Sequence, residues 1–330
     1  MGYGEAPWEF RGRALYQLSL VRVEEARKYV PAELPLVSFF GWTLGGFYLA
    51  RYSDSPVGAF DECVALAGLA WNFPTSCAWA ARVYVNDRDA RDHGIASVGL
   101  PSRMASFKAL PLPALQGGGG AEGSSSLGGR HDRPARQADS SSSGGSRGRH
   151  GSWWDLPHAR SRRGGGEPGT SAPGAGSPTA VVELCNSEPA GRGGAGLWGL
   201  LGGRGRRDTH GRGLSSPVCR IEMPQLAPAW APRIQMFLPS FSGATPDHPG
   251  LLKYSLKLTA YVRPLPPARV TFPGTRPEEE RSSPEALNAV LGGRPLLCLA
   301  FDDMEMLVQP PQPWHPTAPD ALAAPTAVAG

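Results

Sequence analysis

The sequence predicts a mainly β protein, an antiparallel or mixed β-barrel with few short helices that is interrupted by long disordered Gly/Ser/Arg-rich insertions. First, apolar and polar residues alternate with a period of two in Gly12–Val23 and Leu252–Val262, as expected of strands with one buried face. Second, the helix-like stretches are too few for a doubly wound α/β fold, which needs helices of about 10–15 residues between strands. Third, 27 of the 43 glycines fall between residues 114 and 216.

Residues 1–113 form the first part of the predicted barrel. The first strand places Ala14, Tyr16, Leu18 and Leu20 on one face and polar residues on the other; the polar residues are Arg13, Gln17 and Ser19. A short helix follows and ends before a proline, which cannot continue it. The further elements expected here are strands at Gly41–Tyr52, Glu62–Trp71 and Ala78–Val85, and helices at Glu24–Val30 and Asp87–Gly94.

Two features of this segment indicate how its strands lie. Gly45-Gly46 suggests a bulge or a bend at a barrel corner, because glycine inside a strand permits close approach of the backbone. The run Glu62–Trp71 is almost wholly apolar, which is typical of a strand covered on both faces.

The middle of the chain is a poor candidate for folding. Runs such as GGGG and SSSS cannot bury enough apolar surface to offset roughly 1–2 kcal/mol of backbone entropy per residue. One stretch differs, since TAVVELCN at 179–186 is apolar and rich in β-branched residues. We therefore expect a barrel strand at 179–186 between two disordered insertions, 114–178 and 187–216.

The remaining part of the barrel is predicted at residues 217–309. Its clearest strands are Leu252–Val262 and a closing strand at Pro295–Gln309, with a surface loop at Thr275–Gly293 between them. The Pro/Ala-rich tail, 310–330, should be disordered.

Composition excludes several classes of function. The net charge of +4 resides in the Gly-rich middle, so the barrel has no concentrated basic face for nucleic acid. The longest apolar runs reach about nine residues, too few to span a bilayer at roughly 20, and no transmembrane segment is expected. No His or Cys pair has metal-ligand spacing, and two matches to GxGxxG follow from the glycine content, so neither metal nor cofactor is predicted. Five cysteines without a CxxC pair, and no signal or transit peptide, favour an intracellular protein with free thiols.

Several long blocks resemble a known family. They are GYGEAPWEFRGRALYQLSLV, GWTLGGFYLARYSDSPVGAFDE, WNFPTSCAWAARVYVN, DHG, VGLPS, MFLPSFSG and LLKYSLKL. These blocks look very like the plant neoxanthin-deficient family and, more distantly, the acetoacetate-decarboxylase-like barrel superfamily that contains it. The resemblance covers about 1–108, 179–186 and 219–309, and it implies the fold of that superfamily.

The decarboxylases of this superfamily use a lysine Schiff base, for which a neighbouring cation activates the lysine. Their lysine lies in a Gly-x-Pro-Lys-Lys block, which here reads Gly-Leu-Pro-Ser-Arg, so Ser102 stands in the place of the nucleophile and Arg103 keeps the adjacent charge. The family's arginine and glutamate match Arg13 and Glu62, whereas its second glutamate is replaced by Tyr48. Since a hydroxyl cannot form an imine with a ketone, the resemblance implies a protein that is not a Schiff-base decarboxylase.

The candidate pocket residues are therefore Arg13, Glu62, Ser102 and Arg103. Glu62 shares a strand face with apolar residues, so burial should raise the pKa of its carboxyl group unless Arg13 lies close. In the functional interpretation, these residues grip or polarise an oxygen of a ligand. In the alternative one, Arg13 and Glu62 form a buried ion pair that contributes little net stability.

The resulting hypothesis is that the chain is an accessory β-barrel protein required for formation of neoxanthin. Neoxanthin is a xanthophyll upstream of abscisic acid in land plants. No catalytic residue is named in this hypothesis. Its expected ligand is apolar and oxygenated, a carotenoid or an isoprenoid, and enzymes of the xanthophyll pathway are possible partners. The pathway implies a plant or green alga and a chloroplast location, with the cytosol as the alternative. Two other functions stay open: a lyase or hydratase acting on a keto acid or isoprenoid with Glu62 as acid/base, and a scaffold that uses the insertions.

Overall fold

A computed structural model describes residues 3–110, 180–187, 216–224, 230–272 and 287–315. The strands are β1 (Trp8–Arg22), β2 (Trp42–Asp54), β3 (Phe60–Asn72), β4 (Thr75–Val85), β5 (Ser102–Leu110), β6 (Ala180–Asn186), β7 (Ser216–Met223), β8 (Arg233–Ser242), β9 (Leu252–Leu265), β10 (Arg269–Thr271), β11 (Arg294–Val308) and β12 (Gln312–Pro313). The helices are α1 (Val23–Ala26), α2 (Arg88–His93), a π-helical turn η1 (Gly94–Val98) and α4 (Asn288–Leu291). None of the helices in these ranges is long and apolar enough to cross a membrane.

Seven of these strands close into a barrel. Hydrogen-bonded neighbours follow one another in the order β1, β2, β3, β4, β8, β9 and β11, and β11 returns to β1. All of these pairs are antiparallel except β4 and β8, which are parallel. The prediction of a mainly β barrel with few short helices is confirmed.

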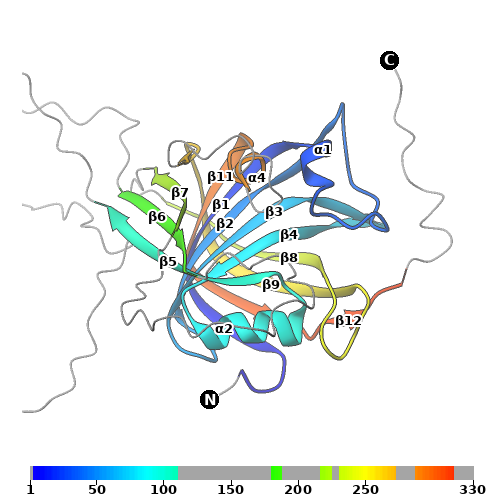
Figure 1. Cartoon of the computed structure of the whole chain (residues 1–330). Helices are drawn as coiled ribbons and strands as arrows, with labels where there is room; N and C mark the ends of the chain where they lie inside the picture. The colour runs from blue at the N-terminus through cyan, green and yellow to red at the C-terminus, as the bar shows by residue number, and fades with distance from the viewer. Residues whose placement is uncertain (1–2, 111–179, 188–215, 225–229, 273–286, 316–330) are drawn as a thin grey trace, which may run out of the picture.

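A second group of strands extends the sheet beyond β4. β5 runs parallel to β4, and β6 and β7 continue outward, as Figure 1 shows on the left of the barrel. β10 pairs with the outer side of β7. The strand expected at 179–186 is β6, which pairs with β5 on one side and β7 on the other. Most of both predicted insertions, 114–178 and 187–216, lies outside the described residues.

The beginning of the predicted tail is ordered instead of disordered. Gln312 and Pro313 form β12, which pairs with β9. The following Trp314 explains this, because its ring packs edge-on against Phe241 at 4.9 Å between centroids and its backbone N–H bonds Leu251 O. The remainder of 310–330 lies outside the described residues.

Part of the barrel wall is buried on both faces. One apolar cluster fills part of the barrel interior, and a second packs outside the wall beneath α1, α4 and the β5–β7 extension. The β3 strand shows this directly, since Val64 and Leu66 face the interior while Cys63 and Ala65 belong to the outer cluster, as its apolar sequence predicted. The outer cluster also corrects an expectation for β1, whose supposedly solvated Gln17 and Ser19 are 2% and 0% exposed.

Gln17 is tolerated in this buried place because its amide satisfies two backbone groups. Its Nε2 donates to Ala268 O at 3.1 Å, and its Oε1 accepts from Ala268 N at 2.7 Å. These bonds tie β1 to the loop that follows β9. The alternation of apolar and polar residues cannot reveal such a pair, because the partner lies 251 residues away.

Local sequence explains two bends that shape the barrel. Gly46 has φ of +122°, and a side chain there would collide with the carbonyl of Gln17, so the predicted close approach at Gly45-Gly46 is confirmed. The helix expected at Glu24–Val30 is shorter than predicted. It ends at Ala26, and the guanidinium of Arg27 then donates to the carbonyls of the following loop.

Candidate functional site

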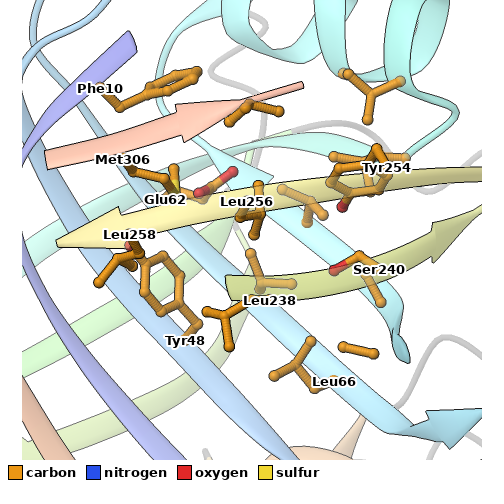
Figure 2. A pocket seen from close by; sticks show the side chains of 18 of the residues that line it. Phe10, Tyr48, Glu62, Leu66, Leu238, Ser240, Tyr254, Leu256, Leu258 and Met306 are labelled. Atoms are coloured by element: carbon orange, nitrogen blue, oxygen red, sulfur yellow. The ribbon is translucent and has the colours of Figure 1, made fainter. Parts of the chain in front are cut away.

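The barrel encloses a cavity of about 450 Å³. Its lining among the described residues is dominated by aromatic and aliphatic side chains from β1, β2, β3, β4, β8, β9 and β11. Figure 2 shows Leu238 and Leu256, from β8 and β9, beside Glu62 and Tyr48. An apolar cavity of this size with few polar groups is the usual form of a small-molecule site.

Among the described residues that line the cavity, Glu62 carries the carboxyl group. It lies on β3 between Ala50 of β2 and Val85 of β4, where the barrel surrounds it. The hydroxyl of Tyr52 donates to Glu62 Oε2 at 2.8 Å. Desolvation raises the pKa of Glu62 to about 7, and the hydrogen bond from Tyr52 opposes the rise. The carboxyl group thus keeps its proton to a higher pH than an exposed glutamate and can donate or accept a proton near neutral pH.

Buried tyrosines extend this polar site. Tyr48, which the resemblance aligned with a glutamate, lies on β2 beside Tyr52 and donates its hydroxyl to Met304 Sδ at 3.1 Å. Farther along the cavity, Tyr254 is hydrogen-bonded to Ser240. Burial raises the pKa of each of these phenols, so they stay neutral and can hydrogen-bond an uncharged oxygen.

Ser102 lies in the cavity wall, as the Gly-Leu-Pro-Ser-Arg block predicted. It begins β5 and is 6% exposed. Two glycines allow this corner to form. Gly99 has φ of +76° and lies against the backbone of Gly243, and Gly94 leaves room for the Ser102 hydroxyl, with which a larger residue would collide. A lysine in this position would start from the cavity wall, whereas serine presents only a short hydroxyl.

Arg13 and Arg103 do not line the cavity, although they were expected there. Arg13 is exposed, and its Nε lies 4.0 Å from Asp302 Oδ1 on the outside of the barrel. Arg103 directly follows Ser102 on an extended strand, so its side chain points to the opposite face, where its charge acts on Tyr84. No arginine or lysine lines the cavity within the described ranges. Because Arg13 lies outside the cavity, it does not offset the effect of burial, and the pKa of Glu62 is raised as expected.

His93 belongs to the site but was not predicted. It ends α2, whose N-terminus is capped by the Asp87 side chain. Its imidazole stacks on Tyr3 at 3.7 Å between ring centroids and meets Trp8 edge-on at 4.3 Å. Desolvation lowers the pKa of His93 to about 4, so the ring is neutral at pH 7. In the sequence, His93 stood out only as part of the block DHG. Its place in the site could not be predicted, because the periodicity of a helix does not show which part of the protein the helix packs against.

The described residues contain no group of three or more His, Cys, Asp or Glu side chains that could hold a metal ion. The five cysteines are buried and free. Burial raises the pKa of four of these thiols: Cys63, Cys77, Cys219 and Cys298.

Comparison with known proteins places the chain in a family. No protein-family model matches it. It is 38% identical over 332 residues to Protein NEOXANTHIN-DEFICIENT 1 of Oryza sativa subsp. japonica, covering 94% of this chain and 90% of that protein. The proteins of the same name from Solanum lycopersicum and Arabidopsis thaliana are each 34% identical, covering 94% and 96% of this chain and 93% and 96% of theirs.

The solved structures to which the chain is similar are more distant. They include an acetoacetate decarboxylase, with a TM-score of 0.47 and 10% identity over 93% of this chain and 88% of that one. Another is the enduracididine biosynthesis enzyme MppR, with a TM-score of 0.43 and 11% identity over 93% and 87% of the two chains. On the evidence of its plant relatives, the chain belongs to the NEOXANTHIN-DEFICIENT 1 family.

Proposed function

We propose that this protein binds an apolar molecule bearing a neutral oxygen function, a xanthophyll or another isoprenoid, and thereby supports formation of neoxanthin. The names of its relatives point to that pigment. The observation that carries the proposal is the cavity itself, which combines apolar walls with Glu62 and hydrogen-bonding phenols. In its protonated form, the carboxyl group of Glu62 can donate a hydrogen bond to an epoxide, hydroxyl or carbonyl oxygen without a nearby cation.

The same geometry argues against Schiff-base decarboxylation in this protein. Ser102 occupies the place of the family's lysine, and no other lysine reaches the cavity wall within the described residues. An imine requires a primary amine beside the substrate carbonyl, and that requirement is not met there. We therefore propose an accessory, ligand-binding role.

A second function is favoured by the pKa of Glu62. A carboxyl group that titrates near pH 7 suits general acid/base catalysis, in which Glu62 would protonate the oxygen of a bound isoprenoid. A keto acid fits less well, because its carboxylate would enter an apolar cavity whose described lining has no cationic partner.

One experiment with three proteins distinguishes the accessory role from the catalytic one. Purified wild type, Glu62→Gln and Glu33→Gln are titrated with xanthophylls and isoprenoid alcohols, following pigment absorbance and tryptophan fluorescence, and reaction mixtures are analysed for new products. Glu33 is exposed and lies outside the cavity lining, so its variant controls for loss of a carboxylate. Saturable binding that weakens in Glu62→Gln alone, without product, supports the accessory role. Product formed by wild type and lost in Glu62→Gln supports the catalytic alternative, and absence of binding contradicts both.

Complementation tests the biological part of the proposal. We propose a chloroplast location and association with enzymes of the xanthophyll pathway. A plant line lacking the family member, expressing a tagged copy of this protein, should regain neoxanthin, with the tag in chloroplasts. Restored pigment with Glu33→Gln but not with Glu62→Gln is expected. Failure of wild type to restore neoxanthin would contradict the role in its formation.

A further inference from the structure

The barrel has one weakly closed seam. β4 and β8 share only two residue pairs, Ala78 with Ser240 and Trp79 with Phe241. By contrast, β1 pairs with β11 along almost its whole length, and β8 pairs with β9 at every residue from Arg233 to Ser242. Within the described chain, the edge of β8 that precedes Ser240 therefore has no strand partner on the β4 side.

Local sequence explains why pairing stops there. Pro239 precedes the paired Ser240 and has no N–H to donate to a neighbouring strand. On the other side of the seam, β4 begins at Thr75, directly after the turn that holds Phe73 and Pro74. On the side of the seam that precedes Ala78 and Ser240, no residue pair joins β4 to β8 among the described residues.

The exposed part of the cavity lining lies at this seam. Among the residues that line the cavity, only Thr75 and Phe237 are exposed, and they lie on β4 and β8, on opposite sides of the seam. Phe237 is 67% exposed. Toward its other end, the cavity is covered by the stacked rings of Tyr3 and His93. Glu62 faces Val85, ten residues along β4 from Thr75, and so lies far from the exposed part of the lining.

The volume of the cavity limits how much of a ligand it can hold. A dry protein cavity of about 150 Å³ binds one benzene molecule. On that scale the cavity of about 450 Å³ holds roughly three six-carbon rings. That is less than half of the carbon skeleton of a xanthophyll, so a ligand of that class cannot be enclosed whole.

We propose that the cavity binds one end of a long apolar molecule, with an oxygen of its end group at Glu62, and that the rest of the chain leaves the barrel between β4 and β8. Thr75 and Phe237 then contact the part of the ligand that crosses the wall. The inference rests on the proposed function and adds to it the class of ligand, a molecule longer than the cavity. It also assigns a specificity role to two residues remote from Glu62.

Two probes distinguish this arrangement from full enclosure. Zeaxanthin carries a hydroxylated ring at each end of a long polyene, and 3-hydroxy-β-ionone represents one such ring alone. Equilibrium dissociation constants are measured for both probes with wild type, Thr75→Trp and Ala109→Trp. Position 109 is an exposed strand residue on β5 outside the cavity lining, so its variant controls for an added indole.

Thr75→Trp should weaken zeaxanthin binding at least tenfold and change 3-hydroxy-β-ionone binding less than twofold, while Ala109→Trp affects neither. Phe237→Glu, at an exposed residue on the other side of the seam, should cause the same selective loss and provides a second variant if Thr75→Trp does not fold. Equal effects on both probes, or none, would overturn the inference while leaving the proposed function intact. If wild type binds neither probe, both proposals fail.

Discussion

Replacing Glu62 by glutamine should remove a component of stability that depends on pH. The pKa of Glu62 is about 7 in the folded protein, against an ordinary value of 4.5. Between these values the unfolded chain has lost the proton and the folded chain has kept it. The contribution of Glu62 to the free energy of unfolding therefore decreases as pH rises from 4.5 to 7, and it is fully present only below pH 4.5.

The magnitude follows from the size of the shift. Each pKa unit corresponds to about 1.36 kcal/mol, so the contribution of Glu62 to the free energy of unfolding should fall by about 3 kcal/mol across this range. His93 acts in the opposite direction. Its pKa is lowered to about 4 from 6.5, so stability is lost as pH falls through this interval, by an amount that partial exposure reduces. The two effects oppose each other in wild type, which makes the total pH dependence uninformative.

The difference between wild type and Glu62→Gln isolates the carboxyl group, since His93 is present in both. Urea unfolding is measured for both proteins at pH 4.5, 5.5, 6.5 and 7.5. The difference in free energy of unfolding, wild type minus variant, should fall steadily, and an infrared band of a protonated carboxyl group should vanish in the variant at pH 6. A difference that is constant across the series would show that Glu62 titrates normally and would refute the assignment of a buried, protonatable acid.

The other predictions concern the supports of the cavity. Gly99→Ala should lower the free energy of unfolding by about 1–3 kcal/mol, because residue 99 has φ of +76° and a side chain would strike a backbone carbonyl. In the same urea titration, the control Gly250→Ala should change that free energy by less than about 0.5 kcal/mol, because residue 250 lies in open space. Equal losses in the two variants would contradict this reason. Gln17→Leu should cost about 2–5 kcal/mol, since both backbone groups of Ala268 lose their hydrogen bonds to the buried amide, and a neutral result would indicate that water replaces the amide. Arg13→Ala should change xanthophyll affinity less than twofold, because the side chain is exposed outside the barrel, and a tenfold loss would place Arg13 in the ligand site.

Much of the fold could be predicted because strands are encoded locally. The alternation in Leu252–Val262 and the apolar run Glu62–Trp71 correspond to β9 and β3, which extend a few residues beyond the predicted bounds. The isolated stretch at 179–186 corresponds to β6. Each of these predictions depends only on residues within one strand, where a period of two fixes which side chains share a face.

The site was predicted in part, and the errors have a common origin. Glu62 and Ser102 line the cavity, as the blocks around them indicated. Arg13 and Arg103 do not, because a one-residue shift along an extended strand moves a side chain to the other face. The position of His93 in the cavity lining could not be predicted from the sequence, because it depends on where α2 packs.

The sequence by itself determined which segments become strands, where glycine permits a bend, and that residue 102 has no amine. These are properties of single residues and of neighbours along the chain. Only the tertiary structure decided which strand faces enclose a cavity, which carboxyl group loses its water, and that β4 and β8 pair at only two positions. Those outcomes depend on contacts between residues far apart in the chain, such as Tyr48 with Met304 or Ala78 with Ser240, and barrel closure brings them together.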